Sequence, residues 1–166
     1  MDNTQIRLLE QKDWEIWKQF RLETLQNEPE NFESSYEDEL HWPDSKFQDM
    51  LTNNDIFATF VNNSLASCAA FYQMHRSKTK HRGVIWSVYT KPEYRRMGIA
   101  SILLNEIINK TRERVSQLHL NCLTYNTSAI ELYKKHGFRI YGIEPKSIKV
   151  NNEFFDEYLM ILDFLS

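Results

Sequence analysis

The chain has few glycines, prolines and cysteines, the residues that favour turns or form disulfides. Its 166 residues include four glycines, four prolines and two cysteines. No apolar run approaches the ~20 residues that cross a bilayer, and the first fifteen residues mix charges with apolar side chains instead of forming a secretory stretch. We therefore expect a soluble, cytoplasmic protein that does not bind membranes.

The two cysteines point to neither a metal site nor a disulfide framework. Cys68 and Cys122 lie in apolar stretches, and neither belongs to a CxxC pair or to a Cys/His spacing that binds zinc. We expect both to be small buried hydrophobic residues, and we predict no metal cofactor.

Charge is nearly balanced overall but uneven along the chain. The net charge of -3 argues against a general affinity for nucleic acid. Residues 22–45, the acidic segment, carry eight Asp and Glu and no Lys or Arg, whereas residues 75–82, the basic turn, carry four Lys/Arg and two His. Both stretches are interpreted either as solvated surface or as binding surfaces, the acidic segment for a cationic ligand and the basic turn for an anionic one.

What the chain does have is apolar material for one core. Hydrophobic residues make up 42% and aromatic residues 13%, which suits a domain that buries about two-thirds of its unfolded surface. No linker, repeat or low-complexity segment interrupts residues 1–166. We predict a single α+β (mixed α/β) domain.

The N-terminal half favours a strand, two helices and a hairpin. A strand is expected at 4–10, and Asp13 is placed to cap the first helix. A second, shorter helix is expected to begin at Pro43. Asn62 and Asn63 tolerate the positive φ of a tight turn between two strands. The apolar repeat of the first helix is Trp14, Trp17, Phe20 and Arg21, and that of the second is Phe47, Met50 and Leu51.

The C-terminal half alternates strands and helices. The near-continuous apolar character of 84–90 predicts a central strand buried on both faces, and 118–123 is another strand. Two last strands, 138–144 and 153–164, are expected to be joined by 145–152. Of the two helices, one carries Ile99, Ile102, Leu103 and Ile107 on one face, and the other carries Ala129, Leu132, Tyr133 and His136 and ends at Gly137.

Gly98 stands between a strand and a helix, in a chain that uses few glycines. The backbone N–H groups of 96–101 would point out of a helix N-terminus, which attracts anions. A missing Cβ at Gly98 lets a diphosphate approach these groups, and Arg95 and Arg96 can add positive charge. The alternative is a surface turn whose glycine only starts a helix. The P-loop and GxGxxG patterns are absent.

Two motifs resemble those of the GNAT superfamily of N-acetyltransferases. The stretch VYTKPEYRRMGIASILL is similar to the acyl-CoA motif of that superfamily, with Arg95, Gly98 and Ala100 at its defining positions. The stretch NTSAIELYKKHGF resembles the second motif, and the order of elements agrees over essentially the whole chain. The residues that match the second motif are Asn126, Ala129, Leu132, Tyr133, Gly137 and Phe138.

The resemblance implies a fold and a binding mode for acetyl-CoA. It implies a twisted, mostly antiparallel sheet of about seven strands, flanked by about four helices and splayed between 84–90 and 118–123, with the pantetheine arm in the opening. By similarity, Val88 N–H would polarise the thioester carbonyl, Asn126 would position the cofactor, and Tyr133 would contact it and protonate the departing thiolate. The implied pantetheine contacts are Val88, Tyr89 and Thr90, and the implied pyrophosphate contacts are Arg95, Arg96, Met97, Gly98, Ile99, Ala100 and Ser101.

The implied reaction is acetyl transfer from acetyl-CoA to a primary amine by direct attack in a ternary complex. An ammonium substrate must first lose a proton. Many relatives use a carboxylate on the central strand, but 84–90 has none. Glu33, Glu37 and a water-linked Glu157 are alternatives, although ordinary solvation explains each of them better. The five histidines have no clear triad partner in any motif.

The acceptor is expected to be a cationic amine. In the superfamily the acceptor enters from the side formed by the first two helices and the late strands, and in this chain the first-helix region contains the acidic segment. Glu33, Tyr36 and Glu37 are the candidate substrate-binding residues. Two other functions stay open: a non-catalytic acyl-CoA-binding or sensing domain, and a protein-interaction module that uses the basic turn. Homodimerisation through the C-terminal strands is also possible.

Overall fold

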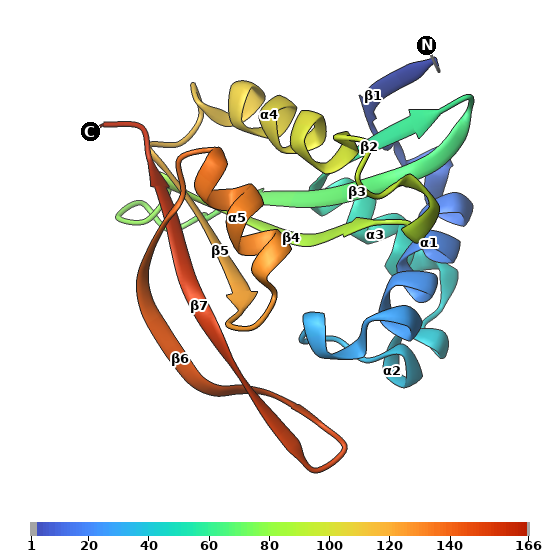
Figure 1. Ribbon diagram of the computed structural model, residues 1–166. Coiled ribbons are helices and arrows are strands. Elements are labelled where there is room, and N and C mark those ends of the chain that lie inside the picture. Colours follow the sequence, from blue (N-terminus) through green and yellow to red (C-terminus); the bar gives the residue numbers. More distant parts are fainter. Residues whose placement is uncertain (1–2, 166) are drawn as a thin grey trace.

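The computed structural model describes residues 3–165. Its strands form one seven-stranded sheet in the order β1-β2-β3-β4-β5-β7-β6 (Figure 1). The pair β4 and β5 is parallel and the other neighbouring pairs are antiparallel, so the predicted mixed, mostly antiparallel sheet is confirmed. The strands are β1 (Thr4–Leu8), β2 (Asp55–Val61), β3 (Ser64–Gln73), β4 (Arg82–Thr90), β5 (Gln117–Leu123), β6 (Arg139–Val150) and β7 (Glu153–Asp163).

Helices cover both faces of the sheet. Helices α4 and α5 pack on one face, where Leu103, Ile107 and Tyr133 enter the larger core cluster. Helices α1 and α3 pack on the opposite face through Trp17 and Phe47. The α-helices are α1 (Trp14–Asn27), α2 (Tyr36–Leu40), α3 (Asp44–Asn53), α4 (Ile99–Thr111) and α5 (Thr127–Lys135), and the short 3-10 helices are η1 (Gln11–Asp13), η2 (Pro29–Asn31) and η3 (Pro92–Tyr94).

Two turns form as the sequence predicts. Asn62 and Asn63 adopt φ of 49° and 66° between β2 and β3, which is the backbone that a two-residue hairpin turn requires. Gly137 adopts φ of 93° just after α5, as expected of a glycine that ends a helix. Both predictions are confirmed because the local backbone demands these residue types.

The sheet opens between β4 and β5. These strands pair only between Arg82–Val84 and Gln117–His119. Farther along β4, Ser87 adopts φ of 53°, and the pairing with β3 shifts register between Cys68 and Ala70. The bulge turns the strand away from β5. From Ile85 onward the β5-facing backbone of β4 is therefore left without a paired strand, which confirms the predicted splay.

Two details of the helices differ from the predictions. The Asp13 side chain does not cap α1; it accepts hydrogen bonds from the Arg7 guanidinium and from Glu10 N–H, because a neighbouring cation is the stronger partner. Ile102 was placed on the buried face of α4, but it is exposed. Leu104 and Ile108 are buried instead, since the sheet covers a different sector of the helix.

The boundaries of two other elements also differ. Residues 145–150 belong to β6 rather than to a connection, although Pro145 cannot donate to a ladder. Strand β6 accommodates them because it is an edge strand, with a register shift between Glu144 and Ile148. Helix α2 was not predicted, because its five residues are too few to display a helical period. In residues 3–165, no helix is long and apolar enough to span a membrane.

Candidate active site

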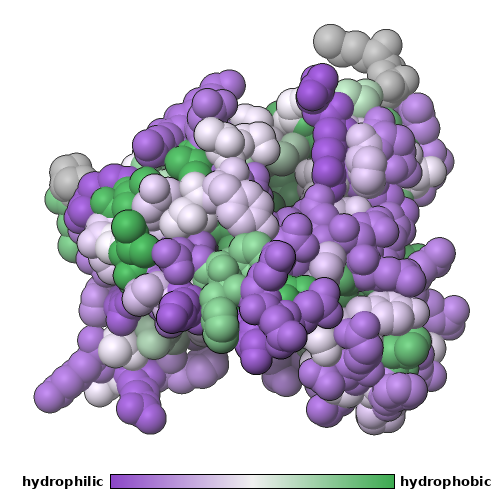
Figure 2. All heavy atoms as spheres, turned by 60° about the horizontal axis from the view of Figure 1, so that its bottom comes forward, coloured by the Kyte–Doolittle hydropathy of each residue, from purple (hydrophilic) through white to green (hydrophobic). Residues whose placement is uncertain are grey.

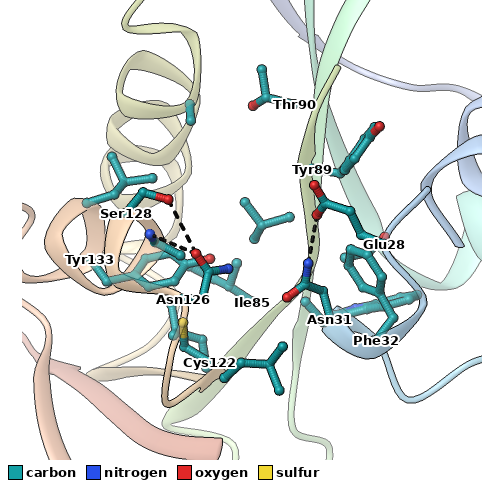
Figure 3. Close-up of a pocket in the computed structure, with 18 of the residues that line it drawn as sticks. Glu28, Asn31, Phe32, Ile85, Tyr89, Thr90, Cys122, Asn126, Ser128 and Tyr133 are labelled. Carbon is teal, nitrogen blue, oxygen red and sulfur yellow. Dashed lines mark hydrogen bonds between the residues drawn. The ribbon is translucent and has the colours of Figure 1, made fainter. Parts of the chain in front are cut away.

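A cleft of about 1400 Å³ lies where β4 and β5 part. Figure 3 shows its two sides: Asn126 and Tyr133 come from α5 and the turn before it, and Glu28 and Phe32 come from the connection between α1 and α2. Ile85 of β4 lies between them. The cleft therefore joins segments that are far apart in the sequence.

The start of α4 leaves its first backbone amides open to a ligand. Gly98 precedes the helix with φ of 76°, and a Cβ built on it would have no atom within 4 Å. Arg96 is exposed and also has a positive φ, 62°. The first amides of a helix lack intrahelical acceptors and carry the positive end of the dipole. With space left open at Gly98, these amides can hold a phosphate.

Arg95, in contrast, is engaged within the protein. Its Nε donates to Thr90 O at 2.9 Å, and its guanidinium pairs with the Glu28 carboxylate and lies 5.5 Å from the Tyr89 ring centroid. Glu28 also accepts from Asn31 Nδ2 at 2.8 Å. The Arg95 side chain thus connects the loop before α4 to the end of α1, and the charge free to meet an anion is that of Arg96.

The central strand supplies the floor of the cleft. Val88, Tyr89 and Thr90, for which the family resemblance implies pantetheine contacts, all border the cleft. Their β5-facing backbone has no paired strand, and an unpaired strand edge can bond an extended ligand as a further strand would. These three residues follow the Ser87 bulge directly.

A buried ion pair fixes that bulge. Arg21 of α1 donates from Nε and Nη2 to the two carboxylate oxygens of Glu39 in α2, at 2.9 and 2.8 Å, and from Nη1 to Ser87 Oγ at 2.7 Å. Both charged side chains are at most 2% exposed. The sequence placed Arg21 in an apolar stripe and missed the pair. An arginine at a core position was the available signal, because such a charge needs a buried partner.

Helix α5 contributes two polar groups. Asn126 caps the helix by accepting from Ala129 N–H, and it also accepts from Ser128 Oγ (Figure 3). Tyr133 is buried and packs edge-on against Phe138. Burial, with a smaller contribution from Cys122, raises the pKa of Tyr133 well above its usual value. The phenol therefore stays protonated at neutral pH and can donate a hydrogen bond.

Both cysteines are free and buried, as predicted. Cys122 lines the cleft, and burial raises the pKa of its thiol to about 12. It is therefore a protonated, weakly nucleophilic group. Among residues 3–165, no three His, Cys, Asp or Glu residues come together in a way that could hold a metal ion.

Half of the acidic residues of the acidic segment are neutralised by ion pairs. They are Glu23, Glu28, Glu39 and Asp44, with Lys91, Arg95, Arg21 and Lys18 as their respective partners.

Not all of the predicted site residues border the cleft. Of the predicted substrate-binding residues, Glu33 borders it, while Tyr36 and Glu37 are not among its described lining residues. Met97, predicted to contact the pyrophosphate, is also outside that lining, and the residue is 51% exposed.

The remaining acids give the cleft a negative character on the α1–α2 side. Glu30 and Glu33 line it there, and Glu157 of β7 lines it from the other half of the sheet. Figure 2 shows hydrophilic residues over much of the face that brings the bottom of Figure 1 forward, with hydrophobic residues in separate patches at the left and near the middle. The basic turn, residues 75–82, contributes none of the described lining of this cleft.

A sequence model of the acetyltransferase (GNAT) family matches residues 14–138. The chain belongs to this family. It is 36% identical over 69 residues to the L-amino acid N-acetyltransferase AaaT of Escherichia coli K12, covering 40% of this chain and 43% of that protein. It is 28% identical over 109 residues to N-alpha-acetyltransferase 50 of Danio rerio, covering 64% of each. The chain thus spans less than two-thirds of the length of either relative.

Solved structures of GNAT proteins share the fold over nearly the whole chain. An acetyltransferase of the GNAT family from Streptococcus pneumoniae superposes with a TM-score of 0.86 at 25% identity, covering 97% of this chain and 99% of that one. The yncA protein of Salmonella typhimurium, solved with its cofactor acetyl-CoA, superposes with a TM-score of 0.78 at 16% identity, covering 98% and 94%. The predicted fold class is therefore confirmed.

Proposed function

We propose that this GNAT protein transfers the acetyl group of acetyl-CoA to a primary amine by direct attack in a ternary complex. The observation that carries the proposal is the cleft itself, in which an exposed helix N-terminus at Gly98 and an unpaired strand edge at Val88–Thr90 open onto the same space. The first suits a diphosphate and the second suits an amide-bearing chain. A coenzyme A thioester has both.

The residues present fit such a cosubstrate. The amides after Arg96, with Gly98 leaving space above them, would hold the diphosphate, and Val88–Thr90 would pair with the pantetheine. Asn126 would contact the same arm from the α5 side. When bound, acetyl-CoA supplies an acetyl group activated as a thioester. The cleft volume of about 1400 Å³ leaves room for an acceptor as well.

The chemical work of the chain is positioning and hydrogen-bond donation. Holding an amine next to an acyl carbon lowers the activation barrier by several kcal/mol, and the reduction reaches about 7–11 kcal/mol in well-oriented systems. Val88 N–H donates toward the developing oxyanion, a contribution of about 3 kcal/mol. Tyr133, kept neutral by burial, donates a hydrogen bond to the departing sulfur.

Substitution of Gly98 tests the binding site. Gly98→Val should weaken acetyl-CoA binding at least tenfold in calorimetry, because the side chain projects into the open space over the amides and a β-branched residue disfavours φ of 76°. Gly137→Ala is the control for backbone strain outside the cleft lining, since it puts a Cβ at φ of 93°, 3.1 Å from Leu162 Cδ1. Equal affinity in Gly98→Val and the native protein would refute the assignment.

We further propose that the acceptor is a cationic small molecule or a peptide or protein amine. Glu30 and Glu33 line the α1–α2 side of the cleft and take part in none of the ion pairs found in residues 3–165. They are therefore free to attract a positive charge. Acetylation rates should be compared across polyamines, aminoglycoside-like compounds, lysine peptides and peptide N-termini at rising salt. Cationic acceptors should lose rate with salt, and a preference for anionic amines would contradict the proposal.

A further inference from the structure

The proton carried by an ammonium acceptor needs a destination, and strand β4 does not offer one. Its segment Arg82–Thr90 contains no carboxylate. None of the five histidines contributes to the described lining of the cleft. The acids that line the cleft are Glu28, Glu30, Glu33, Glu131 and Glu157.

Burial separates Glu157 from the other four. Its side chain belongs to a residue that is 5% exposed, and the other four residues are intermediate or exposed. Glu28 is also occupied by Arg95 and Asn31. A carboxylate surrounded by bulk water gains little from its position, whereas a buried one can hold a proton in a defined place. Glu157 is therefore the acid whose location is specific.

The hydrogen bonds of Glu157 orient its carboxylate. Ser147 Oγ donates to Oε2 at 2.9 Å, and Asn121 Nδ2 approaches the same oxygen at 3.5 Å. Within residues 3–165, no hydrogen-bond partner is found for Oε1. Since Oε1 is not among the fully enclosed unpartnered atoms of the described chain, it keeps some contact with solvent, and Glu157 is one of the residues that line the cleft. One oxygen is fixed and the other is available to a ligand.

Strand register places Glu157 and Tyr133 on opposite faces of the sheet. Glu157 is paired with Leu123, and the next pair along the strands is Tyr158 with Cys122. Directly paired residues share a face and adjacent ones alternate. Cys122 belongs to the core that contains Tyr133, so Glu157 faces the other side, toward the α1–α2 connection. The charge of Glu33 on that connection also acts on Glu157.

Resting on the acetyl transfer proposed above, we infer that Glu157 is the general base: it takes a proton from the acceptor ammonium on the α1–α2 side of the cleft. The first nitrogen-bound proton moves to Oε1 of Glu157, which later releases it to water. The amine lone pair then forms the C–N bond to the acetyl carbon, and the C–S bond breaks with its electrons going to sulfur. The neutral Tyr133 hydroxyl, on the other face, gives its proton to that sulfur. Tyr133 is then reprotonated by the second nitrogen-bound proton, so in net terms that proton is transferred from nitrogen to sulfur.

The electrostatic environment agrees with this role. Burial raises the pKa of Glu157, its hydrogen bonds to Ser147 and Asn121 oppose the rise, and the charges of Glu33 and Glu144 add to it. A carboxylate with a raised pKa is a stronger base and transfers protons more readily near neutral pH. Separation of the base from the acid by the sheet prevents them from exchanging a proton directly.

The test compares Glu157→Gln with Glu131→Gln, a matched loss of one carboxylate in the same cleft. In Glu157→Gln, kcat should fall about 100-fold or more, while acetyl-CoA affinity in calorimetry stays within twofold. The acidic limb of the kcat/KM profile against pH should disappear. Glu131→Gln, at an exposed residue to which no role is assigned, should keep kcat, KM and that limb.

A second readout needs no cosubstrate. The titration of the Glu157 carboxyl is followed by ¹³C NMR in the unliganded protein, with Glu157→Gln identifying its signal. The midpoint should coincide with the acidic limb of kcat/KM, which reports the free enzyme. A Glu157→Gln enzyme with native kcat and native pH profile would overturn the inference and leave the acetyltransferase proposal intact. A native protein that neither binds acetyl-CoA nor acetylates any amine would overturn both.

Discussion

Tyr133 and Glu157 are both acids whose pKa is raised by burial, yet the same cause gives them different roles. A phenol with a raised pKa stays neutral at any physiological pH and can donate a hydrogen bond. A carboxylate with a raised pKa ionises closer to neutrality, so it can take up and release a proton. At the residue scale, the unperturbed pKa of a group and its burial together decide whether it acts as a hydrogen-bond donor or as a base.

Removal of the Tyr133 hydroxyl should separate catalysis from binding. In Tyr133→Phe the ring keeps its packing against Phe138, so stability and acetyl-CoA affinity should change little. Turnover should fall at least tenfold, because the sulfur loses its donor. Tyr125→Phe, an exposed residue of the same cleft, is the control. A non-catalytic acyl-CoA-binding protein would show no turnover in any of these proteins.

The raised pKa of Glu157 also predicts how stability depends on pH. The folded-state pKa lies above the unfolded value, so burial has no cost below the unfolded pKa and destabilises the fold as pH rises through the folded pKa. Glu157→Gln removes this cost. Urea unfolding across a pH series should show the variant gaining stability relative to the native protein as pH rises. A constant difference would contradict the shift.

At the scale of elements, Arg21 ties three segments together. It comes from α1, its partner Glu39 from α2, and Ser87 from the bulge of β4. The positive φ of Ser87, 53°, is unfavourable for a residue with a side chain and needs surrounding support. The hydrogen bond from Arg21 supplies it beside Val88. The same guanidinium thus contacts both the α1–α2 side of the cleft and strand β4.

Breaking this ion pair should destabilise the fold strongly. Arg21→Met leaves Glu39 buried without a partner, which typically costs about 3–5 kcal/mol. The double change Arg21→Met with Glu39→Leu should recover most of that loss, because no unpaired charge remains, but it should still lower kcat, since Ser87 loses its donor. Urea unfolding and steady-state kinetics measure the two effects. A double variant as unstable as the single one would refute this account.

At the scale of the whole molecule, the cleft depends on contacts between distant segments. Two residues of the loop before α4 pair with the α1 region. Lys91 pairs with Glu23 of α1, and Arg95 pairs with Glu28, which directly follows α1. These pairs also reduce the negative charge of the acidic segment where the cosubstrate would enter. Cytoplasmic location and homodimerisation through the C-terminal strands stay predictions.

Binding of acetyl-CoA should stabilise the whole fold, since its site exists only in the folded chain. At a ligand concentration 100 times the Kd, the expected gain is about 2.7 kcal/mol. Thermal unfolding with and without acetyl-CoA measures it, with Gly98→Val as the control that should shift little. The absence of stabilisation in the native protein would instead favour an interaction module based on the basic turn.

The parts of the site that follow from the sequence are those fixed by local backbone. Gly98 and Gly137 occupy positive φ, and the paired asparagines 62 and 63 form their turn, because short-range sterics require such residues there. The sequence did not reveal that Ile102 would be exposed or that residues 145–150 would extend β6. Those outcomes depend on which neighbour covers each face.

The sequence alone determined the order of the seven strands and of helices α1, α3, α4 and α5, the open helix start at Gly98 and the family motif around it, because each is set by residues close together in the chain. Only the tertiary structure decided that Arg21 meets Glu39, that Arg95 is held by Glu28, and that Glu157 is the buried acid of the cleft. Each of these depends on partners at least 18 residues away in the chain or on strand register, and burial and charge acquire their effect only once the distant groups are packed together.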